Sequence, residues 1–150
     1  MLGGLDHAGV ASRLPHAGRM CLLDRVVRWD ECSLRCTAVS HRDADNPLRE
    51  AAGLSTFAGI EYAAQAAAVH GSLLHDATVP RSGVLAALKN VTASQPWLHQ
   101  VTEEIMIDVT LLHSDPAGGI FKFLVVADTR RLLSGQFTLM YIGDSQEPAG

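Results

Sequence analysis

The sequence has little charge and no long apolar run. Of its 150 residues, 19% are charged and 47% are hydrophobic, and the formal net charge is -4. This composition is typical of a globular chain. It lacks the basic excess that non-specific nucleic-acid binding requires. No apolar run reaches the roughly 20 residues needed to cross a bilayer. We therefore expect a single domain over residues 1–150, cytoplasmic, with no membrane or nucleic-acid partner.

Cysteine is scarce as well, and several site motifs are missing. Cys21, Cys32 and Cys36 are the three cysteines, and an odd number at this spacing is not a disulfide framework. Asp6 and His7 interrupt the first ten residues, so we expect no signal peptide. No group of His, Cys and carboxylate residues has metal-site spacing, and neither a phosphate-binding glycine loop nor a Gly-x-Ser-x-Gly elbow is present. A metal site is not expected.

One helix is expected between two blocks of strands. The expected helix, residues 57–75, includes five alanines between positions 63 and 68, and alanine has the highest helix propensity. Ser55 or Thr56 can cap this helix. The alternation of apolar and polar residues predicts strands at 22–29, 34–39, 84–91, 105–111, 120–127 and 137–141. This order predicts an α+β domain in which a strongly bent antiparallel sheet of about six strands wraps the helix.

The two polar or glycine-rich stretches before the helix are expected to be irregular. Residues 1–13 are rich in Gly and Ala, and we expect them to be loosely held. Residues 41–53 are polar, with Pro and Gly, and are expected to form a loop. The helix alone cannot cover both the face and the edge of such a sheet, so a second subunit is expected to complete the burial.

Four stretches share their order and spacing with a known family. They are Leu-Pro-His at 14–16, Leu-Leu-Asp-Arg-Val-Val at 22–27, Gly-Ile-Glu-Tyr-Ala-Ala-Gln at 59–65 and Gly-Ile-Phe-Lys-Phe at 119–123. Together they resemble the hotdog-fold 3-hydroxyacyl-[acyl-carrier-protein] dehydratases. With Asp-Asn-Pro-Leu at 45–48, the sequence is most similar to the ApeP-like branch, the dehydratases of aryl polyene clusters.

This resemblance implies a fold, a substrate and an assembly. The implied fold is a hotdog, and the implied substrate is a 3-hydroxyacyl or polyenoyl thioester on the phosphopantetheine arm of acyl carrier protein, in fatty-acid or aryl-polyene biosynthesis. In that family two chains build the active site at a dimer interface, and the acyl chain enters beside the central helix. The partners implied are therefore acyl carrier protein and a second hotdog subunit, in a homodimer or a heterodimer, with no free cofactor.

Dehydration needs an acid for the hydroxyl, a base for the carbon and a donor to the thioester oxygen. Glu61 is our candidate acid, because burial in this apolar helix would raise the pKa of its carboxyl. Gln65 lies four residues on, on the same helix face, and would hold that carboxyl. The backbone N–H groups around Ala58 and Gly59, at the helix start, would polarise the substrate carbonyl.

The sequence leaves open which residue acts as the base. The family's loop histidine, in Gly-His-Phe-Pro-Gly, is replaced here by Asn-Pro-Leu-Arg-Glu at 46–50. His16, His41 or a residue of another chain could take over. The helix and strand histidines, at positions 70, 75, 99 and 113, are expected to face solvent or to cap an element. Three alternatives remain: a hotdog thioesterase, a non-catalytic subunit that stabilises a catalytic partner, and a dehydratase of a different pathway.

Overall fold

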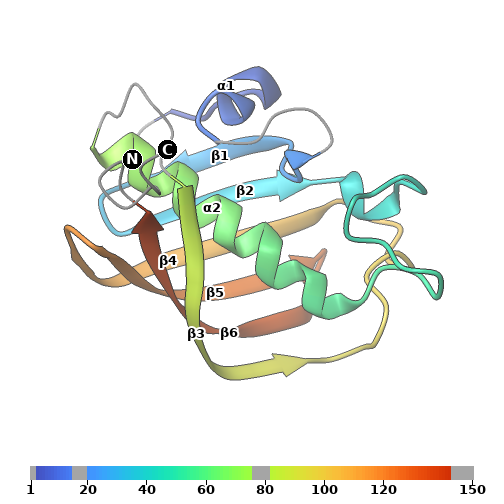
Figure 1. Cartoon of the computed structure of the whole chain (residues 1–150). Coiled ribbons are helices and arrows are strands. Elements are labelled where there is room, and N and C mark those ends of the chain that lie inside the picture. Colours follow the sequence, from blue (N-terminus) through green and yellow to red (C-terminus); the bar gives the residue numbers. More distant parts are fainter. Residues whose placement is uncertain (1–2, 15–19, 76–81, 143–150) are drawn as a thin grey trace, which may run out of the picture.

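A long helix crosses the concave face of a six-stranded antiparallel sheet (Figure 1). The structure is a computed structural model and describes residues 3–14, 20–75 and 82–142. Helix α2 spans Gly59–Leu74 and follows a short 3-10 turn at Thr56–Ala58. The strands are β1 (Arg25–Trp29), β2 (Ser33–Ala38), β3 (Ser82–Ala93), β4 (Ile105–Asp115), β5 (Gly118–Ala127) and β6 (Arg130–Ile142), in the spatial order β1-β2-β4-β5-β6-β3. The α+β architecture predicted from the sequence is confirmed.

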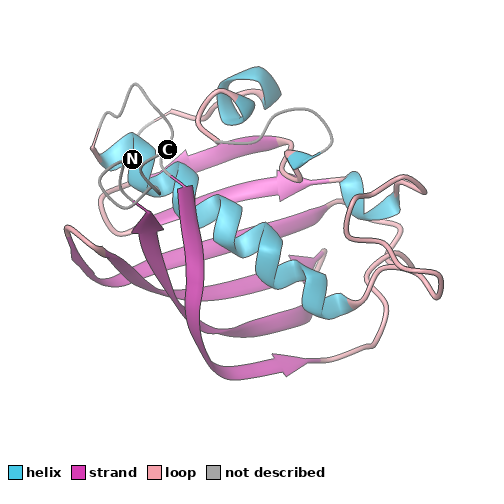
Figure 2. Ribbon diagram, viewed as in Figure 1, coloured by secondary structure: helices cyan, strands magenta, loops and turns pink. Residues whose placement is uncertain are grey.

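Small residues let α2 lie close to the sheet. Its alanines at positions 63, 66 and 67 are fully buried, and Figure 2 shows the helix against one face of the strands. A Cβ atom added at Gly59 would lie 2.8 Å from Leu133 Cδ2 of β6, so a side chain there would push the sheet away. Three rings of β5 and β6, Phe121, Phe123 and Phe137, pack beneath the helix with centroids 5.4 to 5.7 Å apart. Close contacts between α2 and the side chains of the sheet therefore form a continuous core.

The two edges of the sheet differ. Beside β1, the N–H of Leu5 donates to the carbonyl of Val26 (3.1 Å), and the N–H of Val26 donates to the carbonyl of Leu5 (2.9 Å). Helix α1 (His7–Ala11) continues this cover and buries Val10. Within residues 1–13, Leu5 is thus paired with β1 and Val10 is buried, while most of the other described residues of this segment are exposed.

At the opposite edge, β3 pairs with β6 and has no strand on its other side among the described residues. It bends sharply (Figure 1). Near the bend, Asn90 has a left-handed backbone (φ +55°), and the register shifts between Lys89 and Thr92. Such bulges bend a strand. The open N–H and C=O groups of β3 leave this edge able to pair with another chain.

Several strand boundaries differ from the sequence expectation, among them the starts of β1 and β6. Strand β1 begins at Arg25 rather than at residue 22, because Leu22 and Leu23 are buried in the segment that approaches α2. Strand β6 begins at Arg130, seven residues earlier than expected from 137–141, although residues 130–136 have little strand propensity. Pairing with β5 on one side and β3 on the other overrides that propensity. In the described part of the chain, no helix is both long and apolar enough to cross a membrane.

Candidate active site

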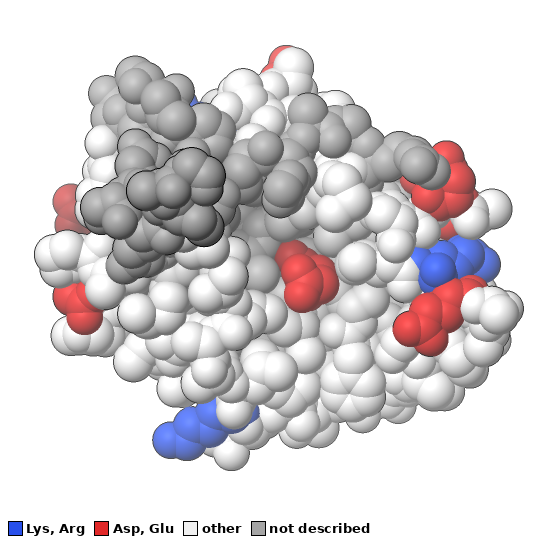
Figure 3. Space-filling view, in the orientation of Figure 1, with Lys and Arg blue, Asp and Glu red and all other residues white. Residues whose placement is uncertain are grey.

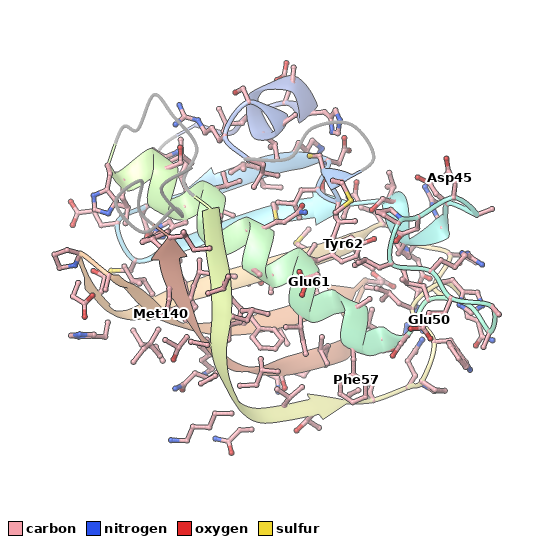
Figure 4. The ribbon with its side chains drawn as sticks, viewed as in Figure 1. Asp45, Glu50, Phe57, Glu61, Tyr62 and Met140 are labelled. Atoms are coloured by element: carbon pink, nitrogen blue, oxygen red, sulfur yellow. The ribbon has the colours of Figure 1, made fainter. Side chains whose placement is uncertain are left out.

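Glu61 lies in the first turn of α2, on the helix face that points away from the sheet (Figure 4). Its side chain is exposed, and it makes no hydrogen bond or ion pair with any residue that the structure describes. The space-filling view shows a face that is mostly uncharged (Figure 3), and Figure 4, drawn from the same side, labels Glu61 near the middle of it. The expectation that the helix itself buries this carboxyl is wrong for the single chain, because Tyr62 and Ala63, the next two residues, take the buried positions.

Large apolar side chains remain exposed near this carboxylate and at the open edge. They form an apolar rim, defined as Phe57 (54% exposed), Val84 (47%), Leu88 (51%), Met140 (37%) and Ile142 (39%). Phe57 lies in the 3-10 turn that leads into α2, four residues before Glu61. The other four lie on β3 and β6, and Val84 is paired with Met140. Apolar side chains concentrated beside an unpaired edge mark an interaction surface.

Gln65 does not hold the Glu61 carboxyl as expected. Its Oε1 accepts a hydrogen bond from the N–H of Leu22 (2.9 Å), and its Nε2 donates to the carbonyl of Met20 (2.6 Å). Both polar atoms of the amide are therefore hydrogen-bonded, and they hold the backbone of residues 20–22 against α2, one turn from Glu61. This contact fixes the chain immediately after residues 15–19. The candidate base His16 falls within that stretch, which lies outside the described residues.

The N–H groups of the turn that leads into α2 already have acceptors. Thr56 donates to Pro96 O, Phe57 to Ser55 Oγ, Ala58 to Ser55 O, and Gly59, the first residue of α2, to the carbonyls of the preceding turn. The 3-10 turn that leads into α2 satisfies these groups. The donor role expected for Ala58 and Gly59 is therefore wrong, and Gly59 is needed instead for the close approach of Leu133.

His41 is enclosed in the core and cannot serve as the base. Its side chain is fully buried, and its Nε2 lies 3.0 Å from the carbonyl oxygens of both Val101 and Glu103. Two carbonyl acceptors require the proton on Nε2, so this nitrogen donates. Burial lowers the pKa of His41, more strongly than the two carbonyls raise it. The residue anchors the segment that leads into β4.

Asn46 stands near the place of the family's loop histidine, and it points inward. Its Nδ2 donates to Tyr62 Oη (3.0 Å) and to the carbonyl of Ser40 (2.9 Å), while its Oδ1 accepts from the N–H of Leu48 (2.8 Å). Tyr62 Oη also lies 2.7 Å from Ser40 Oγ. This network locks the loop to α2 beside Glu61. Sequence reasoning missed it, although Asn before Pro47 is a known turn signal.

Two clefts of the described surface lie away from Glu61. One of about 430 Å³ lies beside Asn46, between residues 21–24 and 39–47, and the other, of about 510 Å³, lies on the sheet face opposite α2. Glu61 lines neither of these two clefts. Within the described segments, no three His, Cys or carboxylate side chains are grouped so as to hold a metal ion.

The buried histidines predict a loss of stability in mild acid. Burial lowers the folded-state pKa of His41 and of His70, which is also fully buried, below the ordinary value of 6.5. The unfolded chain binds these protons as the pH falls below 6.5, and the folded chain does not, so the free energy of unfolding decreases. We expect a fall of up to about 1.4 kcal/mol per pH unit per histidine.

Urea unfolding at pH 7.5, 6.5 and 5.5 would measure this effect. The His41→Gln variant keeps an N–H donor for the two carbonyls and lacks the titrating group, so its stability should depend less on pH. A wild-type stability that is constant from pH 7.5 to 5.5 would contradict the prediction.

Comparisons with known proteins agree with this architecture. The model of the ApeP-like family, described as ApeP dehydratase, matches residues 8–148. Among solved structures, the dehydratase heterocomplex ApeI:P from Xenorhabdus doucetiae is similar with a TM-score of 0.79 and 23% identity, over 91% of this chain and 93% of that one. A search of curated proteins finds no match.

Thioesterases share the fold as well. A thioesterase from Haemophilus influenzae matches with a TM-score of 0.62 and 11% identity, over 93% of this chain and 92% of that one. A thioesterase from Pseudomonas aeruginosa matches with a TM-score of 0.53 and 14% identity, over 79% and 80%. At these identities the likeness concerns the fold, and the hotdog fold predicted from the sequence is confirmed.

Proposed function

Because the chain belongs to the ApeP-like dehydratase family, we propose that it forms one half of a two-chain dehydratase for 3-hydroxyacyl thioesters carried on acyl carrier protein. One observation carries this proposal. Glu61 is exposed and has no partner among the described residues, on a mostly uncharged face, and the sheet of the same chain has an edge that is open in the described part. A carboxylate in this position is ready to be covered by a second chain and a substrate. Such a substrate would place the enzyme in the cytoplasm.

In this proposal Glu61 is the general acid. A partner that covers the face would exclude water from around this carboxyl, and a water-free site favours the neutral form of a carboxyl group. The protonated carboxyl then gives its proton to the 3-hydroxyl group, which leaves as water. A base elsewhere removes the proton from the carbon next to the thioester carbonyl, and the electron pair forms the new double bond.

The partner is proposed to supply that base. His41 is enclosed in the core, and the Asn46 amide is not basic and is already hydrogen-bonded. A heterocomplex is the form named for the similar ApeI:P dehydratase, which supports a second hotdog chain carrying the loop histidine. His16 of this chain remains the other candidate base.

The open edge of β3 is the proposed site of pairing. The β1 edge is already occupied by Leu5, so strand addition is available only on the β3 side of the described sheet. Joining there would extend the sheet and cover the apolar rim, most of which lies on β3 and β6. Two chains joined in this way would shield their open strand edges and their exposed apolar side chains from water.

A non-catalytic role is the second candidate, and the buried histidine and the inward Asn46 favour it. In that case the chain would stabilise a partner that contains all the catalytic groups. The thioesterase alternative is supported only by the shared fold, which hosts many chemistries.

Product analysis separates the three functions. The purified chain and its complex with a hotdog partner would be incubated with 3-hydroxyacyl carrier protein, and the products identified by mass spectrometry. We expect loss of one water from the carrier-bound chain. Release of free acid would indicate a thioesterase. An unchanged rate when Glu61 is replaced in the complex would indicate a non-catalytic subunit.

A further inference from the structure

The cleft on the outer face of the sheet carries an excess of positive charge. It holds about 510 Å³, and its charged lining residues are Arg28, Arg35, Asp108, Lys122 and Arg131. The chain as a whole has a net charge of -4, yet this cleft carries four cations and one carboxylate. Its lining residues on β4 and β5 alternate with the buried residues under α2. The cleft therefore faces away from Glu61.

The one carboxylate of the cleft, Asp108, is already paired with an arginine. Arg35 binds Asp108 through two hydrogen bonds, Nε to Oδ1 at 2.7 Å and Nη2 to Oδ2 at 3.0 Å. Arg28 is paired directly across from Arg35 in the sheet, a like-charge arrangement that destabilises a strand pair. Neither Arg28 nor the other two cations, Lys122 and Arg131, forms an ion pair with a described residue. Among the residues that the structure describes, three cations of the cleft thus lack a counter-charge.

The arrangement of the cleft fits a protein rather than a small anion. Arg28 lies on β1 and Arg131 on β6, four strands apart in the sheet, which is roughly 19 Å at ordinary strand spacing. Between them lies an apolar floor that includes Leu112, 52% exposed, and Leu124. An apolar centre with a charged rim is the usual anatomy of a protein interface. The negative net charge of the chain excludes a nucleic acid as the favoured occupant.

We propose that this outer cleft docks an amphipathic helix of a second protein, whose carboxylates pair with Arg28, Lys122 and Arg131 and whose apolar face covers Leu112. Spaced carboxylates on a helix can meet spaced cations on a sheet, and complementary charge speeds association. The surface is on the opposite side of the sheet from Glu61 and is separate from the β3 edge. It therefore binds a different partner from the chain that completes the active site.

A synthetic helical peptide is a direct probe of this surface. The peptide would carry Glu on one side and Leu on the other, with a fluorescent label, and a matched peptide would carry Gln in place of Glu. Anisotropy would be measured with the wild-type chain, with the triple variant Arg28→Glu, Lys122→Glu, Arg131→Glu, and with Lys89→Glu. Lys89 is exposed on β3 and lies outside the cleft. We expect the triple variant to weaken binding of the Glu peptide at least tenfold and Lys89→Glu to leave it unchanged.

A single neutral substitution separates docking from folding. Arg28→Gln removes one of two facing cations, so the melting temperature should stay the same or rise while peptide binding weakens. The dehydration activity of the complex should not change, which keeps this test independent of the proposed function. The proposal is overturned if the Glu peptide does not bind, if the Gln peptide binds as tightly, or if Lys89→Glu weakens binding as much as the triple variant.

Discussion

Replacing Glu61 by Gln should lower the rate of dehydration by about 10²- to 10⁴-fold, the usual contribution of a general acid. Gln has nearly the same volume and keeps the ability to form hydrogen bonds, but it has no proton to give to the leaving hydroxyl. The side chain is exposed and unpaired in the single chain, so folding should be unaffected. The rate would be measured on the assembled complex with 3-hydroxyacyl carrier protein, and folding by thermal melting.

Glu50→Gln is a matched control for this experiment. Glu50 is also exposed and loses the same charge on substitution, but it lies in the loop before α2 rather than on the Glu61 face (Figure 4). Its activity should remain that of the wild type. An activity above about a tenth of the wild type in Glu61→Gln would show that Glu61 is not the acid. A complex that fails to assemble would show instead that this side chain belongs to the interface.

The second large effect is expected in the dependence of dehydration activity on a partner chain. The purified chain alone should give no measurable dehydration, and activity should appear when a hotdog partner that contains a loop histidine is added. The reason is that the two described positions considered for the base cannot supply it: His41 is buried, and Asn46 is hydrogen-bonded to Tyr62. Light scattering should show the 16.0 kDa chain combining with its partner.

The His16→Ala variant decides whether this chain supplies its own base. In the pairing scheme the substituted complex keeps its activity. A chain that is active alone and loses that activity in His16→Ala would show that His16 is the base and that no partner is needed. If the chain is active without a partner and His16→Ala leaves that activity unchanged, both schemes are ruled out.

Several elements of the fold could be predicted because they depend on local patterns. The helix was expected over 57–75, and the structure has a 3-10 turn at Thr56–Ala58 followed by α2 at Gly59–Leu74. Strand β4 was expected over 105–111 from its period of two and begins at Ile105. The start of β6 could not be predicted, because residues 130–136 become a strand only through pairing with neighbours on both sides.

The roles of the candidate site residues were harder to predict. Glu61 and Gln65 do lie on α2 as expected, four residues apart, but Gln65 fastens Met20 and Leu22 instead of the carboxyl. A glutamine on a helix carries no sequence signal of which backbone it will meet. The N–H groups of Ala58 and Gly59 were assigned to a ligand because an isolated helix start leaves them free. The preceding turn satisfies them here.

By itself, the sequence determined the α+β class and the order of its elements, since helix propensity and apolar periodicity act between residues that are close in the chain. It also placed Glu61 on the central helix. Only the tertiary structure decided which polar side chains are available for chemistry. His41 is enclosed because it meets carbonyls 60 and 62 residues away, and Glu61 is exposed because the sheet covers the other side of α2. Burial depends on contacts between distant segments, and no local pattern encodes them.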